Sequence, residues 1–106
     1  MNPTPHWTKR AKSRLRDAFL YIATNFYPEY AVAFENDVFS TTEAIPQNPK
    51  IGLEAFPDMK RPQYRKILCK NRTWWVYYRI RGNVVEIAQV VYARQSNINP
   101  FGLPLP

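Results

Sequence analysis

Residues 73–92 read TWWVYYRIRGNVVEIAQVVY, and this stretch decides the fold. Side chains of two kinds alternate along 73–81, which is the period of a β-strand with two different faces. One face would carry Trp74, Val76, Tyr78 and Ile80, and the other Trp75, Tyr77, Arg79 and Arg81. Gly82-Asn83 suits a two-residue hairpin turn. The following strand over 84–93 is apolar on both faces, as a central strand would be.

Two helices precede this hairpin in the sequence. Thr8 is a suitable N-cap for a helix over 9–25. Its apolar residues recur at helical spacing: Ala11, Leu15, Ala18, Phe19, Ile22 and Phe26. Pro28 suits the first turn of a second helix, which Pro46 and Pro49 end. The apolar face of this second helix would be Ala31, Phe34, Val38, Thr42 and Ile45. The short connection predicts an antiparallel helical hairpin.

The remaining segments complete an α+β fold. Residues 46–63 read as a loop and 64–70 as a short strand, whereas a strand near 5–7 has only a weak pattern. We therefore expect an N-terminal antiparallel helical hairpin packed on a small, mainly antiparallel sheet of three to four strands. Residues 1–98 would form a single domain, and the Pro-rich residues 99–106 an extended tail.

Composition excludes several classes of protein. With 106 residues, 45% hydrophobic and 15% aromatic, the chain can build one small core and is not an unfolded basic tail. No run approaches the roughly 20 apolar residues of a membrane span, and the first ten residues lack a signal-peptide core, so we expect a cytoplasmic protein. One cysteine, Cys69, and one histidine, His6, argue against disulfides and a structural zinc site. Cys69 is expected in the core, and His6 at the surface or in a structural role.

The net charge of +7 is unevenly distributed. Residues 63–106 hold seven Lys and Arg against a single acid, Glu86, while the acids gather in 17–58. A second basic cluster lies in 9–16, at the start of the first helix, and its residues are expected mostly on the solvent side of that helix. Such clustering favours an anionic partner, either nucleic acid or an acidic protein.

The order of these elements and their motifs resembles the RelE/ParE family of toxins from type II toxin–antitoxin systems, also called plasmid stabilisation toxins. The resemblance covers nearly the whole chain. Its pieces are WTKRAKSRL (7–15), YPEYAVAFENDV (27–38), NPKIG (48–52), YRKIL (64–68), WVYYRI (75–80) and VVYARQSNINP (90–100). It implies a growth-inhibiting protein that is silenced by a cognate antitoxin in a hetero-oligomer, with no metal, cofactor or membrane involved.

Two mechanisms within that family stay open, because a fold does not determine an activity. RelE-like members are metal-independent endoribonucleases that cleave mRNA in the ribosome, where the site must neutralise charge developing on the phosphate. The resemblance then assigns catalysis to Tyr92, Arg94 and Arg65. Trp75 is a departure, since RNA-cleaving members tend to carry arginine there, and an indole cannot stabilise a phosphorane.

ParE-like members instead inhibit DNA gyrase without being enzymes, and the PEYAVAF and NPKIG segments narrowly favour this branch. Target or nucleic-acid contacts are expected at Lys66, Trp75, Tyr77, Arg79, Arg81 and Gln95. The antitoxin is expected on Trp75, Tyr77 and Arg79, where its terminal segment would add a helix or a strand. A third reading is a non-toxic basic nucleic-acid-binding module, in which Trp75 and Tyr77 would stack on bases.

Overall fold

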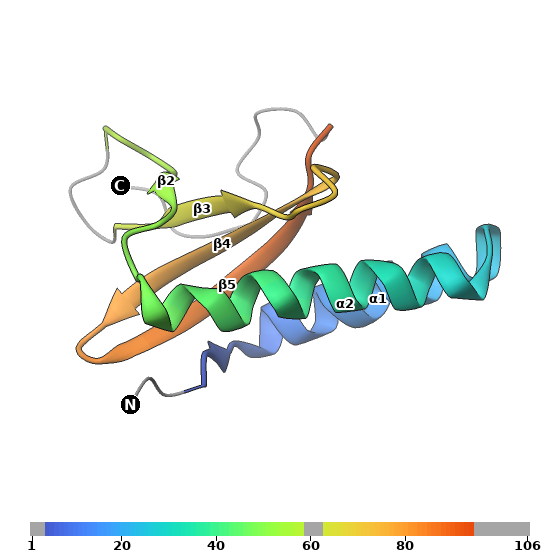
Figure 1. Ribbon diagram of the computed structural model, residues 1–106, viewed down its shortest axis with the longest axis horizontal. Helices are drawn as coiled ribbons and strands as arrows, with labels where there is room; N and C mark the ends of the chain where they lie inside the picture. The colour runs from blue at the N-terminus through green and yellow to red at the C-terminus, as the bar shows by residue number, and fades with distance from the viewer. Residues whose placement is uncertain (1–3, 59–62, 95–106) are drawn as a thin grey trace.

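The computed structural model describes residues 4–58 and 63–94, and Figure 1 shows their arrangement. Two antiparallel helices cover one face of a single sheet. The helices are α1 (Lys9–Asn25) and α2 (Pro28–Ala44), followed by the short 3-10 helix η1 (Ile45–Gln47). The strands are β1 (His6–Trp7), β2 (Leu53–Glu54), β3 (Arg65–Leu68), β4 (Trp74–Arg81) and β5 (Val84–Tyr92). Within these residues, no helix is long and apolar enough to cross a membrane.

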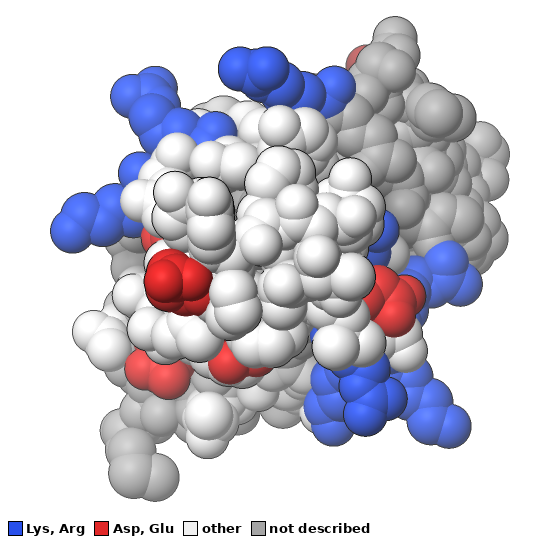
Figure 2. Space-filling model, turned by 90° about the vertical axis from the view of Figure 1, so that its right-hand side faces the viewer, with Lys and Arg blue, Asp and Glu red and all other residues white. Residues whose placement is uncertain are grey.

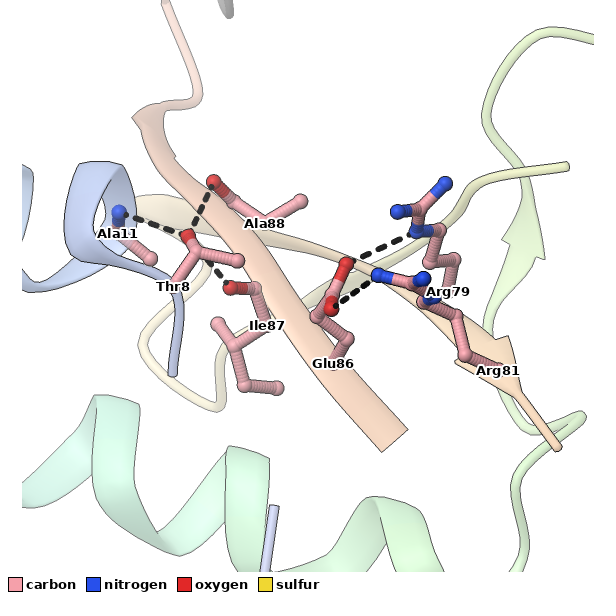
Figure 3. A network of polar contacts seen from close by, with 7 residues as sticks. All are labelled: Thr8, Ala11, Arg79, Arg81, Glu86, Ile87 and Ala88. Atoms are coloured by element: carbon pink, nitrogen blue, oxygen red, sulfur yellow. Dashed lines mark hydrogen bonds and ion pairs between the residues drawn. The ribbon is translucent and has the colours of Figure 1, made fainter. Parts of the chain in front are cut away.

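Both helices begin where the sequence predicts. The Thr8 hydroxyl accepts a hydrogen bond from the backbone N–H of Ala11 at 3.1 Å, which caps α1. The same hydroxyl donates to the carbonyl of Ile87 at 3.0 Å, so the start of the helix is tied to β5 (Figure 3). Pro28 occupies the first turn of α2, and the buried side chains of α2 are Ala31, Phe34, Val38 and Thr42. The expected helical hairpin is therefore confirmed. Phe26, expected on the apolar face of the first helix, instead follows the end of α1 and is 59% exposed.

The sheet has five strands in the order β1-β5-β4-β3-β2, which is more than the expected three to four. β3, β4 and β5 form the expected antiparallel core, and Gly82, with φ of 58°, makes the hairpin turn between β4 and β5. The two additional strands have only two residues each. β1 pairs parallel to β5, so the sheet is mixed, and β2 pairs antiparallel to β3. Strands this short leave no alternating pattern in the sequence.

The main core lies between the helices and the sheet. Val76 and Tyr78 from β4 meet Ile87 and Val90 from β5 there, together with the buried faces of α1 and α2. The pairing passes from Tyr77–Gln89 to Tyr78–Ile87, so Ala88 is an extra residue in β5. This bulge shifts the alternation of β5 by one residue, so that Ile87 before it and Val90 after it both face the main core. Cys69 is buried in this core, as expected.

The segment before β3 is locked to the sheet by Tyr78. Its phenol accepts a hydrogen bond from the N–H of Gly52 at 2.9 Å and donates one to the carbonyl of Pro49 at 2.8 Å. A Cβ on residue 52 would lie 2.8 Å from the Tyr78 oxygen and from the carbonyl of Lys66, so only glycine fits this approach. The NPKIG turn therefore has a structural reason. The predicted tail over 99–106 lies outside the described residues.

Candidate functional site

The sheet face turned away from the helices is called the far face here, and it carries Lys66, Trp75, Tyr77, Arg79, Arg81 and Glu86. The register places these side chains together, because Lys66 pairs with Tyr77 and Arg79 with Glu86. Most of the residues expected to bind a target or an antitoxin therefore share one surface. Gln95 lies outside the described residues.

Glu86 neutralises part of the positive charge on the far face. Its carboxylate accepts hydrogen bonds from Arg79 Nε at 2.9 Å and from Arg81 at 3.3 Å (Figure 3). Burial raises the pKa of Glu86, but the two guanidinium groups outweigh this effect and hold the pKa below its ordinary 4.5. The Arg79 guanidinium also stacks on the ring of Tyr64 at 5.5 Å. Arg79 is thus held by neighbours within the fold, while Arg81 stays mostly exposed.

The two far-face aromatics differ in exposure. Tyr77 is only 8% exposed and packs beside Phe56, with the ring centroids 6.1 Å apart. Burial raises the pKa of its phenol, which therefore stays neutral at physiological pH. Trp75 is half-buried, and the Lys66 ammonium lies 4.7 Å from its ring centroid. Trp75 and Lys66 therefore form an accessible aromatic–cation pair, whereas Tyr77 is buried and packs against Trp75.

Tyr92 lies on the opposite, helix-covered face, at the end of β5. It lines a groove, with a volume of about 820 Å³, between the second half of α1 and the ends of β4 and β5. The Tyr92 ring meets the Trp74 ring at 5.4 Å, edge to face. The groove is lined by Arg14, Asp17, Ala18, Tyr21, Ile22, Phe26, Thr73, Trp74, Tyr92 and Arg94. Tyr92 and Arg94 therefore share one site.

Arg14 is a groove residue that sequence reasoning missed. Its Nε donates to the carbonyl of Val90 at 3.3 Å, and its guanidinium carbon lies 5.9 Å from the Trp74 ring centroid. The basic cluster of the first helix was expected to face solvent. Arg14, however, lies three residues after Ala11 and four before Ala18, both buried, and this spacing turns it toward the sheet.

Arg65 lies apart from Tyr92 and Arg94. Arg65 pairs with Tyr78 of β4, and Tyr92 pairs with Trp74 of β4, so their positions along the sheet differ by four residues. This is about 13 Å along the strands, and the step from β3 to β5 adds about 10 Å across two strand spacings. The buried side chains of Val76 and Val90 lie between them. Arg65 instead donates to the carbonyl of Gly52 at 2.7 Å and holds the NPKIG turn. The three residues that the RelE-like reading assigns to catalysis do not form one cluster.

Other reactive side chains fit structural roles. Burial raises the pKa of the Cys69 thiol to about 11, so it stays protonated and is a poor nucleophile. His6 is exposed at the sheet edge in β1. Across residues 4–58 and 63–94, no three His, Cys, Asp or Glu side chains lie close enough together to hold a metal ion.

Comparisons with known proteins agree with this architecture. The model of one family, the ParE toxin of the type II toxin–antitoxin system parDE, matches residues 6–97. A solved chain described as the chromosomal ParDE TA system from P. aeruginosa superposes with a TM-score of 0.69 over 86% of this chain and 98% of its own, at 16% identity. At that identity the likeness shows the fold alone. No curated protein matches this chain. The family model spans most of the sequence, and the chain therefore belongs to the ParE toxin family of type II toxin–antitoxin systems.

Proposed function

We propose that this toxin acts as a non-enzymatic inhibitor of DNA gyrase and that a cognate antitoxin neutralises it by covering the far face. The ParE match over residues 6–97 supports a toxin component with an antitoxin partner. The observation that carries the choice of mechanism is the separation of Arg65 from Tyr92 and Arg94.

Cleavage of RNA by its own 2′-hydroxyl requires cations that converge on one phosphate in the transition state. Arg65 cannot reach a phosphate held at Tyr92, because the buried centre of the sheet intervenes. Its guanidinium is also engaged with the carbonyl of Gly52. This arrangement supports inhibition by binding over nuclease catalysis.

The far face has the chemistry of a protein-binding surface. Trp75 and Lys66 form an accessible pair, and Tyr77, Val91, Ala55 and Phe56 pack into a second apolar cluster beneath and beside Trp75. Tryptophan above a packed apolar base is the usual anchor of a protein interface. An amphipathic antitoxin segment with acidic residues would bury Trp75 and pair with Lys66 and Arg81.

The test compares the two target pathways with purified toxin. Supercoiling by DNA gyrase is measured against toxin concentration, and mRNA integrity is measured in a translating extract. We expect inhibition of supercoiling at toxin concentrations that leave the mRNA intact. Intact gyrase activity together with ribosome-dependent mRNA cuts would contradict the proposal.

The alternative, a ribosome-dependent endoribonuclease, has one observation in its favour. Tyr92, Arg94 and Arg14 line the same groove, so a phenol and two guanidinium groups surround one space. If this groove cleaves RNA, Tyr92→Phe and Arg94→Ala should abolish growth arrest. Full toxicity of both variants would leave gyrase inhibition as the better account.

A further inference from the structure

The end of the helical hairpin, residues 20–30, is called the hairpin tip here, and Ile22 is its one large side chain that packs against the core. The last buried residue of α1 is Ala18 and the first of α2 is Ala31. Figure 1 shows the two helices continuing past the end of the sheet to the connection between them. The tip therefore projects from the molecule, and most of its large side chains are exposed rather than buried.

The tip is aromatic where a projecting helix end is normally polar. Five of its large apolar side chains are 54–62% exposed: Leu20, Tyr21, Phe26, Tyr27 and Tyr30. Such a concentration of exposed apolar side chains within eleven residues marks an interaction surface. Tyrosine and phenylalanine are also enriched in the cores of protein interfaces and lose little side-chain entropy when they bind.

The aromatic side chains are held in place before any partner arrives. The Tyr27 and Tyr30 rings meet edge to face at 5.3 Å, and those of Tyr21 and Phe26 at 6.2 Å. The turn is closed by hydrogen bonds from the N–H of Phe26 to the carbonyl of Ile22 and from the N–H of Tyr30 to the carbonyl of Tyr27, both at 2.9 Å. Preorganisation of this kind lowers the entropic cost of binding.

The charge around the tip identifies the kind of partner. The tip itself contains one acid, Glu29, and no Lys or Arg, in a protein whose net charge is +7. Figure 2 looks at the hairpin end, where the centre is mostly white with scattered red and the Lys and Arg side chains stand at the rim. Phosphate groups would meet aromatic rings and carboxylates at this centre, so nucleic acid and anionic lipid are poor partners for it. Arginine side chains suit it well, because they stack on tyrosine rings and pair with Glu29.

We propose that the hairpin tip docks onto a compact arginine-bearing, apolar patch of the toxin's protein target. Proteins that handle DNA carry basic surfaces. A tip with aromatic rings, one Glu and no Lys or Arg can approach such a surface, whereas the basic remainder of the toxin is repelled by it. The Lys and Arg side chains around the tip would repel a broad basic surface of the partner, so the contact is limited to the tip itself. This inference rests on the proposed function only in taking gyrase as the target.

The test uses matched pairs of variants in the full chain. The double variant Tyr27→Ala/Tyr30→Ala removes the exposed rings, and Leu53→Ala removes an equally exposed apolar side chain at the other end of the molecule, in β2. Glu29→Lys reverses the charge at the tip, and Glu43→Lys reverses one at the other end of α2. Thermal unfolding of each variant shows that the fold is retained.

Toxin concentrations for half-inhibition of gyrase and growth arrest after induction are the two readouts. For half-inhibition we expect the double variant and Glu29→Lys to require a concentration at least about tenfold higher than the wild type, while both controls match the wild type. Equal inhibition by the double variant and the wild type would overturn the docking site and leave gyrase inhibition standing. Stronger inhibition by Glu29→Lys would overturn the basic character of the partner.

If the wild type does not inhibit gyrase, the proposed function fails and growth arrest decides the docking site. Loss of arrest in the double variant alone would support docking onto another protein target. Equal arrest by all variants, or no arrest by the wild type, would overturn the docking site.

Discussion

Glu86 is the only acid among residues 63–106, and the sequence alone gives it no particular role. In the structure it accepts hydrogen bonds from both Arg79 and Arg81, so one carboxylate organises the basic end of the β4–β5 hairpin. The consequence for function is that Arg79 has less freedom to bind a target than its place in the sequence indicated. Arg81, whose side chain is mostly exposed, keeps more of that freedom.

The lowered pKa of Glu86 predicts a specific loss of stability in acid. Because the folded pKa lies below the ordinary 4.5, the contribution of Glu86 is complete above that pH and disappears as the pH falls through the folded value. Glu86→Gln should cost about 1–2 kcal/mol at pH 7. The melting temperatures of variant and wild type, recorded from pH 7 to pH 3, should therefore converge as the pH falls. A constant gap over this range would show that the ion pairs do not stabilise the fold.

Single residues could be predicted from the sequence where their role is local. Thr8 was expected to cap the first helix because a cap depends on residues three positions away, and it does. The sequence cannot show that Arg65 is tied to the carbonyl of Gly52, or that Arg14 reaches the carbonyl of Val90, 76 residues away. Both contacts depend on how the sheet and the helices are placed in three dimensions.

At the scale of elements, the turn over residues 48–52 and the strand β4 act as a unit through Tyr78. The side chain of Tyr78 is fully buried, and burial raises the pKa of its phenol despite the Gly52 N–H and Arg65, which lower it. The neutral phenol can therefore both donate and accept a hydrogen bond. The turn over residues 48–52 also positions β2 beside β3, and this pairing extends the sheet by one strand.

Removal of this single hydroxyl should loosen the turn. Tyr78→Phe removes the partner of the buried Gly52 N–H and of the half-buried Pro49 carbonyl, at a cost of about 2 kcal/mol or more. The melting temperature should fall by roughly 8–16 °C. Tyr92→Phe, at an exposed phenol, is the matched control and should change stability by less than about 0.5 kcal/mol. Equal melting temperatures for both variants would refute the role given to Tyr78.

The elements themselves were largely readable from the sequence. The two helices, the three longer strands and the hairpin turn at Gly82 all follow from periodicity and turn residues that span many positions. β1 and β2 were not readable as firm elements, because two residues carry no period. They exist because neighbouring strands offer free edges, which is a property of the assembled sheet.

At the scale of the whole molecule, the groups proposed to bind partners lie on two separate surfaces. The far face, with Trp75 and Lys66, lies on the side of the sheet opposite the helices, whereas the hairpin tip projects beyond the end of the sheet (Figure 1). The two surfaces also differ in charge, since Lys66 and Arg81 lie on the first and Glu29 on the second. An acidic antitoxin segment suits the far face, and an arginine-bearing target suits the tip.

This separation predicts opposite phenotypes for variants of the two surfaces. Trp75→Ala should weaken binding of the cognate antitoxin by about tenfold or more, because a tryptophan anchor is lost, and should leave gyrase inhibition unchanged. Tyr27→Ala/Tyr30→Ala should weaken gyrase inhibition and leave antitoxin binding unchanged. Calorimetric titration of the antitoxin and the supercoiling assay, applied to both variants after a check of their melting temperatures, measure the two effects independently. If either variant lowers both activities in a folded protein, the antitoxin and the target share one surface, and neutralisation is direct competition for it.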